Sequence, residues 1–310
     1  PSIRWCRQVA LRKICSPPSS HLCLIVDSVH MVQPKLTQAD YSKISQLVYQ
    51  HSRIHLGDSK MELVSSRLGK RLREHGCSSY TEYCELLHGR HGAEEINHLI
   101  DAISTNHTFF FREKKHFEFL ESTVFSDFNK DPAFRADGRF RCWSAAASTG
   151  EEPYSIAITL ARHAEKNPSF RWSMECSDIS STALATAQAG IYPESRLDEM
   201  PLDIKRRYFQ RGVGSQLGRL RVKSELRANM QWHLMNLFQD SYPFDSKFQV
   251  IFCRNVMIYF DRPSQEWLVN RLARMLVPGG YLKVGHSESL SGITHGLQTI
   301  LPAVYRKAPK

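Results

Sequence analysis

The sequence predicts an α/β protein in which a parallel sheet, covered by helices on both faces, follows a small all-helical domain. From about residue 139 onward, short apolar segments typical of strands alternate with longer amphipathic segments typical of helices. Before residue 105, apolar residues recur every three or four positions, which is the period of a helix. A chain of 310 residues is long enough for two domains, and the change of period indicates where they meet.

Residues 36–104 are expected to form the helices of the first domain. Thr37 precedes the first apolar stripe and is a suitable N-cap. A second helix is predicted at 61–76, where Gly76 is placed to end it, and a third stripe runs through 96–103. The apolar faces of the first two helices are predicted to hold Tyr41, Ile44, Leu47, Val48, Val64, Leu68 and Leu72.

The domain boundaries are predicted at 31–115 for the helical domain, 116–138 for a linker and 139–310 for the sheet domain. A Gly-punctuated stretch indicates a small antiparallel β-subdomain inserted at about 205–230. Strands are expected at 139–146, 171–178, 231–237, 248–255 and 280–287. Helices are expected at 151–166, 179–190 and 264–276, the last ended by Pro278, Gly279 and Gly280.

The composition is that of an ordinary globular protein, with 42% hydrophobic and 23% charged residues. No apolar run approaches the roughly 18 residues that a membrane span requires. The eight cysteines include no C-x-x-C pair, which favours reduced thiols in the cytoplasm. The net charge of +10 attracts anionic partners, a class that includes nucleic acid, acidic protein and lipid headgroups.

Residues 1–30 are expected to be a disordered extension. They hold several basic residues against Asp27 and show no clear helical period, and organised sequence begins soon after Met31. A transit peptide is the alternative, because the stretch is rich in arginine and poor in acidic residues.

Polar side chains follow the predicted strands at the ends where parallel sheets bind their ligands. Asp178 ends the second strand and could accept both hydroxyls of a ribose, which is the marker of an adenosine cofactor. The alternative is that Asp178 caps the following helix. Asn236 follows the third strand, and the fourth is followed by Arg254, Asn255 and Tyr259. A purely structural sheet does not require polar residues at these ends.

The loop after the first strand discriminates between nucleotide cofactors. Residues 143–155 contain only Gly150 where a dinucleotide motif has three glycines, and Glu151 and Glu152 occupy the helix start. Carboxylates there would repel a diphosphate but suit a positively charged cofactor without phosphate. S-adenosylmethionine fits, with its ribose, sulfonium and amino group. The alternative is that the glutamates only stabilise the helix dipole.

Two further segments bear on this cofactor and on the acceptor. Arg112 could bind the cofactor's carboxylate through parallel hydrogen bonds, although an isolated arginine is more often a surface ion-pair residue. Residues 253–261 lack the prolines of the turn found in methyltransferases that act on amino groups. A carboxylate acceptor is already ionised near pH 7 and requires no general base. Tyr259 could orient such an acceptor or line the methyl channel, or it could pack under the next helix. No histidine spacing typical of a metal site is evident, so no metal is expected.

Taken together, these motifs resemble those of the chemotaxis receptor methyltransferase (CheR) family. The resemblance extends from about residue 37 to 308 and includes TNHTFFFRE, WSAAASTGEEPYSIA, SDIS, AGIY, YFQRGVGSQLGRLRV, VIFCRNVMIYFD and GHSESL. It implies a Rossmann-like class I methyltransferase domain that transfers a methyl group from S-adenosylmethionine to glutamate side chains on the cytoplasmic helices of chemoreceptors. The products would be a glutamate methyl ester and S-adenosylhomocysteine.

The resemblance also implies site residues. The family's cofactor contacts correspond here to Asn106, Thr108, Arg112, Glu152, Asp178, Asn236, Leu237, Arg254 and Asn255. The residues implied in catalysis are Tyr259 and Arg254. This chain has His107 where leucine is common in the family, a difference expected to matter little.

Two partner surfaces follow by the same route. A basic helix that docks on the acidic receptor bundle is matched by Arg67, Lys70, Arg71 and Arg73. The alternative is an ordinary solvated helix face. The loop with which some members bind a receptor's C-terminal pentapeptide at a sheet edge is matched by Gly212, Gly214 and Gly218. A cytoplasmic monomer is expected, without a nucleic-acid partner and without membrane insertion.

Two other functions remain open. An RNA methyltransferase would use the basic charge, but the aromatic and basic platform of RNA-binding modules is not evident. A scaffold that binds only cofactor or receptor is the third hypothesis. Such a scaffold could lose Asp178, Arg112 and Tyr259, which this chain keeps.

Overall fold

The computed structural model describes residues 34–90, 92–131, 134 and 138–309. The extension expected at 1–30 lies outside the described residues. Within the described part of the chain, no helix combines the length and the apolar character needed to cross a membrane.

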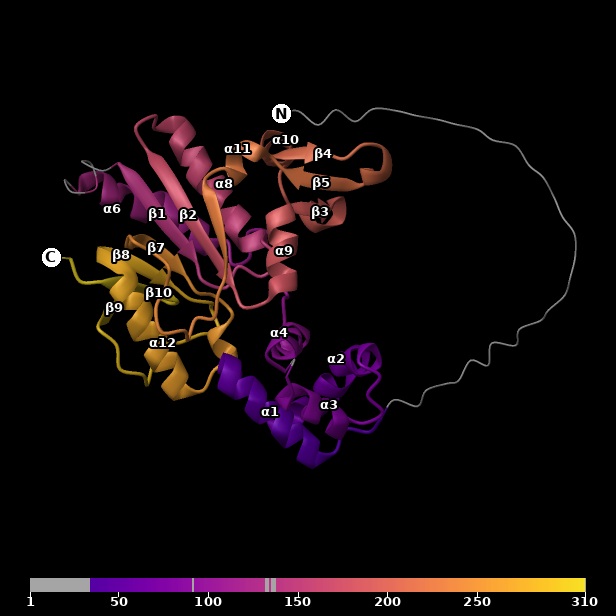
Figure 1. Ribbon diagram of the computed structural model, residues 1–310. Helices are drawn as coiled ribbons and strands as arrows, with labels where there is room; N and C mark the ends of the chain where they lie inside the picture. The colour runs from indigo at the N-terminus through magenta and orange to yellow at the C-terminus, as the bar shows by residue number, and fades with distance from the viewer. Residues whose placement is uncertain (1–33, 91, 132–133, 135–137, 310) are drawn as a thin grey trace, which may run out of the picture. The chain divides into compact units, whose positions relative to one another are not determined.

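The first domain is helical, as predicted (Figure 1). It contains α1 (Gln38–Ser52), η1 (Asp58–Lys60), α2 (Met61–Glu74), α3 (Tyr80–His88) and α4 (Gly92–Ile103). Their apolar faces form one core, in which all seven side chains predicted for the first two helices are buried. Thr37 caps α1, because its Oγ1 accepts the N–H of Asp40 at 3.1 Å. Gly76 follows the end of α2 with a φ of 65°.

The second domain is built on a seven-stranded sheet with the order β6-β2-β1-β7-β8-β10-β9. The strands are β1 (Arg139–Ser144), β2 (Arg171–Asp178), β6 (Met230–Leu234), β7 (Phe248–Phe252), β8 (Leu276–Lys283), β9 (Leu297–Leu301) and β10 (Val304–Lys307). The first five in this order pair in parallel, which confirms the prediction. The last two are antiparallel and are not predicted, because β9 is exposed at four of its five positions and has no apolar alternation.

Apolar side chains pack on both faces of this sheet. Successive residues of β1 enter different cores: Cys142 packs with residues of α8 (Glu151–Lys166), and Trp143 packs with residues of α12 (Arg262–Met275). Burial is complete at the central strand β7, where all five residues are buried, whereas β1 and β2 are buried throughout only at their carboxyl ends. The parallel pairing of the strands brings the polar residues after each strand to the same edge of the sheet. One further helix, α9 (Ser181–Ala189), follows β2.

The segment 116–138, expected to be a linker, instead belongs to the core of the sheet domain. It contains α5 (Lys115–Phe119), a π-helical turn η2 (Leu120–Val124) and α6 (Phe125–Lys130). One core holds this segment's buried residues Phe117, Leu120, Val124, Phe125 and Phe128. Their spacing is that of a helical stripe, and a stripe of this size is stable only when it is packed. The prediction of a linker is therefore wrong for the described part of this segment.

The inserted subdomain is a separate three-stranded antiparallel sheet (Figure 1). Its strands are β3 (Ile191–Pro193), β4 (Phe209–Arg211) and β5 (Arg219–Val222), in the order β3-β5-β4. The connecting helices are η3 (Glu194–Leu197), α10 (Leu202–Tyr208), η4 (Gly214–Gln216) and α11 (Ser224–Arg227). The sheet begins earlier than the predicted 205–230, because β3 pairs with β5 across the intervening helices.

The end of α12 also differs in detail from the prediction. The helix ends at Met275 and β8 begins at the next residue. Pro278, Gly279 and Gly280 lie within β8, beside an irregularity in its pairing with β7. They therefore shape the strand and do not form a turn before it.

Lys283, at the end of β8, is fully buried. Its Nζ donates to the carbonyl oxygen of His116 at 2.6 Å and lies 4.9 Å and 5.3 Å from the ring centroids of Phe119 and Phe252. Burial, assisted by the nearby Arg254 cation, lowers the pKa of Lys283 to about 7.

We expect the free energy of unfolding to increase as the pH rises from about 7 towards 10.5. In this window the unfolded chain keeps the Lys283 proton and the folded chain has lost it, so the unfolded state binds more protons. Lys283→Met should remove this contribution and be most stabilising near pH 7. Urea unfolding across the window would measure it, with exposed Lys166→Met as the control. Wild type and Lys283→Met with the same pH slope would contradict the expectation.

Candidate functional site

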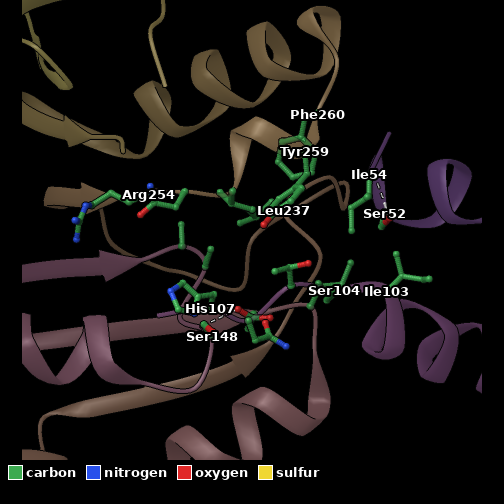
Figure 2. Close-up of a pocket in the computed structure, with 18 of the residues that line it drawn as sticks. Ser52, Ile54, Ile103, Ser104, His107, Ser148, Leu237, Arg254, Tyr259 and Phe260 are labelled. Atoms are coloured by element: carbon green, nitrogen blue, oxygen red, sulfur yellow. Dashed lines mark hydrogen bonds between the residues drawn. The ribbon is translucent and has the colours of Figure 1, made fainter. Parts of the chain in front are cut away.

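A pocket opens at the carboxyl ends of β1, β2, β6 and β7 (Figure 2). All ten residues predicted for cofactor binding or catalysis line it: Asn106, Thr108, Arg112, Glu152, Asp178, Asn236, Leu237, Arg254, Asn255 and Tyr259. Parallel strands end at the same edge of their sheet, so residues far apart in the chain meet there.

Asp178 holds the loop after β1 at the edge of the pocket. It is 8% exposed, and its Oδ1 and Oδ2 accept the N–H groups of Ser180 (2.9 Å) and Ser148 (2.7 Å). Burial raises the pKa of Asp178, and these hydrogen bonds act in the opposite direction. Ser180, whose Oγ accepts the N–H of Ala183 at 3.1 Å, is the cap of α9, so the capping alternative for Asp178 is wrong. Each carboxylate oxygen can accept a further hydrogen bond, so the group remains able to bind two hydroxyls.

The two glutamates at the start of α8 have different surroundings. Glu152 lines the pocket. Glu151 is 1% exposed, accepts the hydroxyl of Thr149 at 2.6 Å and lies 3.7 Å from the Arg196 guanidinium. Burial raises the pKa of Glu151. Of the two glutamates expected to repel a diphosphate, only Glu152 lines the pocket.

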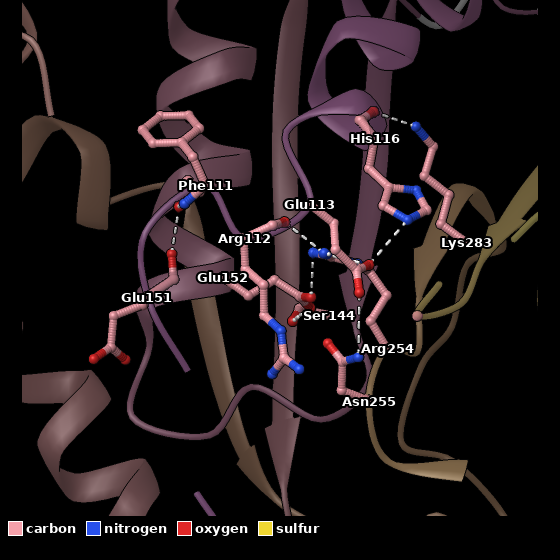
Figure 3. Close-up of polar contacts among 12 residues, drawn as sticks. Phe111, Arg112, Glu113, His116, Ser144, Glu151, Glu152, Arg254, Asn255 and Lys283 are labelled. Atoms are coloured by element: carbon pink, nitrogen blue, oxygen red, sulfur yellow. Dashed lines mark hydrogen bonds and ion pairs between the residues drawn. The ribbon is translucent and has the colours of Figure 1, made fainter. Parts of the chain in front are cut away.

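Arg254 lies between two carboxylates at the base of the pocket (Figure 3). Its Nη1 donates to Glu152 Oε2 and its Nη2 to Glu113 Oε2, each at 2.9 Å. Nη2 also donates to the carbonyl oxygen of Arg112 at 2.5 Å, and Ser144 donates to Glu152 Oε1 at 2.8 Å. With Arg254 only 4% exposed, these contacts connect the ends of β1 and β7 to the segment that carries Asn106 and Thr108.

The charges of this cluster are compensated internally. Burial acts to raise the pKa of Glu113, but hydrogen bonds from His116 and Arg254 outweigh it and hold the pKa well below its usual range. Burial raises the pKa of Glu152, against the effect of Arg254. Arg254 is thus bound by protein carboxylates, so the structure supports a positioning role for it and does not support the predicted catalytic one. Glu113 is not among the predicted site residues, although it ends the TNHTFFFRE motif.

The turn after β7 brings the acceptor-side residues into the pocket. Tyr259 ends the short helix η5 (Met257–Tyr259), is half-buried, and packs partly against the core that contains α12 residues. Tyr259 therefore lines the pocket and also packs beside α12. Arg112, which also lines the pocket, is half-buried, and its Nη1 donates to the carbonyl oxygen of His107 at 3.1 Å.

The helical domain forms part of the pocket wall, which sequence analysis missed. Its contributions are Ser52, Ile54, His55, Leu56, Lys60, Leu63, Ile103, Ser104 and Thr105. Backbone contacts hold this wall to the acceptor side: the His55 N–H donates to the Tyr259 carbonyl at 2.8 Å, and Ile54 forms a bridge with Phe260. Asn236 also joins the two domains, because its Nδ2 donates to the carbonyl of His51 at 2.6 Å.

The predicted docking cations on α2 separate into two pairs. Arg71 is only 19% exposed at its side chain and binds the buried Glu95, with Nε 2.9 Å from Oε1. Arg67 donates to the carbonyl oxygens of Ile103 and Ser104 and so supports the pocket wall. Both cations are hydrogen-bonded within the helical domain. They are therefore not free to dock on a partner, contrary to the prediction. Exposed charge remains at Lys70 and Arg73.

The predicted tether glycines lie together in the subdomain. Gly212, Gly214 and Gly218 occupy the connection between β4 and β5. Gly214 and Gly218 have positive φ angles of 61° and 77°. Turn geometry alone is therefore sufficient to explain why these two positions are glycine. The same connection exposes Val213 and Leu217, which are 81% and 82% accessible.

One group of side chains among the described residues could offer three ligand atoms to a metal ion: Glu113, His116 and His286. Glu113 is already bonded to Arg254, and the buried His116 has its pKa lowered to about 4 by burial. This group is not evident in the sequence, because His286 is far along the chain from Glu113 and His116.

Arg254→Met should destabilise the protein by about 3–5 kcal/mol at neutral pH, because it leaves two buried carboxylates without their cation. The loss should decrease as the pH is lowered and these carboxylates are protonated. Arg162→Met is the control, because Arg162 and Glu121 form an exposed pair at 3.8 Å that should contribute at most about 1 kcal/mol. Urea unfolding of both variants would measure the difference, and similar losses would argue against the buried cluster.

Comparisons with known protein families divide the chain where the structure does. The family described as "CheR methyltransferase, all-alpha domain" matches residues 39–104, and "CheR methyltransferase, SAM binding domain" matches residues 106–304. The second match begins at Asn106, the first residue of the predicted cofactor set, and includes every other member of that set.

Curated relatives match over most of their own length. The chemotaxis protein methyltransferase of Salmonella typhimurium is 42% identical, over 83% of this chain and 86% of that protein. The one from Borreliella burgdorferi is 38% identical, over 88% of this chain and 95% of that protein. The one from Escherichia coli K12 is 41% identical, over 83% and 86%. With both domains matched and the predicted residues gathered in one pocket, the chain belongs to the CheR family of S-adenosylmethionine-dependent methyltransferases.

Proposed function

We propose that this protein methylates glutamate side chains on the cytoplasmic domains of chemoreceptors, with S-adenosylmethionine as methyl donor and glutamate methyl esters as product. The observation that carries this proposal is the pocket in which carboxylates, amides and an arginine converge at the sheet edge. The family match supplies the reaction class, and the relatives named above are chemotaxis protein methyltransferases.

The side chains of the pocket fit S-adenosylmethionine. We assign its ribose hydroxyls to Asp178, its amino group to Glu152 and its carboxylate to Arg112, with Asn106 and Thr108 on the same wall as Arg112. When bound, the cofactor supplies an electrophilic methyl group on a sulfonium centre. The acidic side chains of Asp178 and Glu152 and the guanidinium of Arg112, which all line the pocket, match the groups that this molecule carries.

The acceptor requires orientation more than activation. A glutamate carboxylate is ionised at neutral pH, so no residue has to remove a proton from it. The enzyme's contribution is then to align the acceptor oxygen and to exclude water, which can supply a large part of a rate enhancement. We assign the alignment of the acceptor to Tyr259, because its hydroxyl can donate to a carboxylate oxygen and its ring lines the pocket.

RNA methylation, the competing function, is favoured only by the net charge. Several of the cations behind that charge are bonded within the protein, as Arg254, Arg71 and Arg67 are. The proline-free turn at the acceptor side also differs from that of enzymes that methylate amino groups. These observations favour an acidic side chain as acceptor.

Transfer of a tritiated methyl group tests the proposal directly. Membranes that contain chemoreceptors should gain base-labile label, because methyl esters hydrolyse in alkali. Label on RNA would establish the competing reaction. Cofactor binding without transfer to either substrate would identify a scaffold.

Asp178→Asn should weaken S-adenosylmethionine binding by about tenfold to a hundredfold, because a hydrogen bond to a charged group contributes about 1.5–3 kcal/mol. Asparagine keeps an acceptor for one of the two backbone N–H groups and turns an amide donor towards the other, so the fold has to be measured as well as the affinity. Isothermal calorimetry would give the affinity and circular dichroism the fold. Asp203→Asn, an exposed change in α10, is the control. An unchanged affinity in Asp178→Asn would refute the ribose assignment.

Reversing both exposed charges on α2, as Lys70→Glu with Arg73→Glu, should raise the KM for receptor several-fold. The reason is loss of attraction to an acidic partner, and added salt should reduce the difference from wild type. Affinity for the cofactor should not change. Lys130→Glu with Lys166→Glu, an equal charge reversal on the sheet domain, is the control. If both pairs raise KM equally, α2 is not a specific docking surface.

A tether to the receptor's C-terminal pentapeptide remains part of the proposal. In support of it, β4 is an edge strand of the small sheet, and an edge strand can pair with an extended peptide. The exposed Val213 and Leu217 beside it offer apolar contacts. A monomeric enzyme in the cytoplasm, where the receptor domains lie, completes the proposed function.

A further inference from the structure

We propose that Glu288 is a positioning residue for methyl transfer, because its buried carboxylate holds the turn that presents Asn255 and Tyr259 to the pocket. The role in transfer rests on the function proposed above. The contact between Glu288 and the turn is a property of the structure. Glu288 belongs to the GHSESL motif, which neither the cofactor assignment nor the acceptor assignment uses.

The carboxylate of Glu288 accepts four backbone N–H groups. Oε2 accepts those of Asn255 and Gly285, each at 2.6 Å, and Oε1 accepts those of Met257 (2.7 Å) and Ile258 (3.3 Å). Three of the four donors belong to the turn after β7. The side chain is only 6% exposed, so these bonds have little competition from water.

The turn requires such an acceptor. Asn255 has a φ of 58°, in the left-handed region that a residue with a side chain seldom adopts. The helix that follows, η5, has only three residues, so its first N–H groups have no carbonyl partner within it. A buried N–H without a partner destabilises the fold. One carboxylate therefore satisfies several donors and stabilises an otherwise unfavourable backbone.

The backbone beyond β8 approaches the turn closely at Gly285. A Cβ atom built there would clash with Asn255 Nδ2 and would lie 2.8 Å from Glu288 Oε2 and 3.0 Å from Asn255 N. Only glycine fits without displacing these groups. Gly285 and Glu288 therefore act together: the glycine admits the turn and the glutamate binds it.

This contact determines where two pocket residues lie. Asn255 is the first residue of the turn and Tyr259 ends η5, and both line the pocket. Arg254, immediately before the turn, is fixed by Glu113 and Glu152. Glu288 fixes the residues after it. Displacement of a catalytic group by about 1 Å can cost on the order of a hundredfold in rate, so the orientation of Tyr259 should depend on this carboxylate.

Glu288→Gln tests the inference, because glutamine preserves the shape but replaces one acceptor oxygen with an amide donor that faces N–H groups. We expect kcat for receptor methylation to fall at least about tenfold, with a much smaller change in the KM for receptor. Because Asn255 belongs to the predicted cofactor set, the cofactor Kd should rise, but by a smaller factor than kcat falls. Glu288→Asp keeps the charge on a shorter side chain. Its kcat should lie between that of Glu288→Gln and that of wild type. The amide ¹H–¹⁵N signals of Asn255, Met257 and Gly285 should shift in Glu288→Gln.

Glu266→Gln is the matched control. Glu266 in α12 also accepts a backbone N–H, that of Thr294 at 2.9 Å, but it does not line the pocket. The Glu266→Gln enzyme should have a somewhat lower melting temperature and an unchanged kcat.

Two results would overturn the inference: a kcat for Glu288→Gln within twofold of wild type, or unshifted amide signals in the turn. A parallel fall in kcat, cofactor affinity and melting temperature would also overturn it, because that pattern indicates general loss of structure. Failure of the proposed function would appear differently, as a wild-type enzyme that does not label receptor.

Discussion

The buried ion cluster around Arg254 is the interaction on which the rest of the site depends. One guanidinium joins Glu113, from the segment after the helical domain, to Glu152, at the start of α8. Arg254 itself follows β7, so three parts of the chain that are far apart in sequence are held at one point. Buried charges are costly unless they are paired and hydrogen-bonded, and here each has several partners. The cluster therefore fixes the segment that carries Asn106 and Thr108 relative to the turn after β7.

The pocket is a product of both domains. The connection between α1 and α2 forms one wall, and its backbone is bonded to the acceptor turn through His55 and Tyr259. Arg67 on α2 supports the adjoining segment through the carbonyls of Ile103 and Ser104. The helix assigned to receptor docking is thus in direct contact with the residues that enclose the reaction.

The residues around the acceptor have to position it and do not have to remove a proton from it. A carboxylate acceptor has no proton to lose, so the residues around it need only the right positions. Buried carboxylates of the protein supply those positions, because Glu113 and Glu152 hold Arg254, and Glu288 holds the turn that follows. Their arrangement as backbone and side-chain anchors, and not as proton acceptors, agrees with esterification of an acidic side chain.

Local patterns in the sequence determined the elements and the edge of the sheet at which the site lies. The carboxyl ends of parallel strands meet at one edge of the sheet, so Asp178 and Asn236 could be assigned to the pocket from the predicted strands that they end or follow. Only the tertiary structure decided which charges are free. Arg71 is matched with Glu95, and Glu113 with Arg254, across distances in sequence that no local period encodes. For the same reason the segment after Lys115 was expected to be a linker, although its aromatic stripe is buried against strands that come later in the chain. A helix or strand is specified by neighbours a few residues away, whereas a buried partner is specified by the complete packing of the fold.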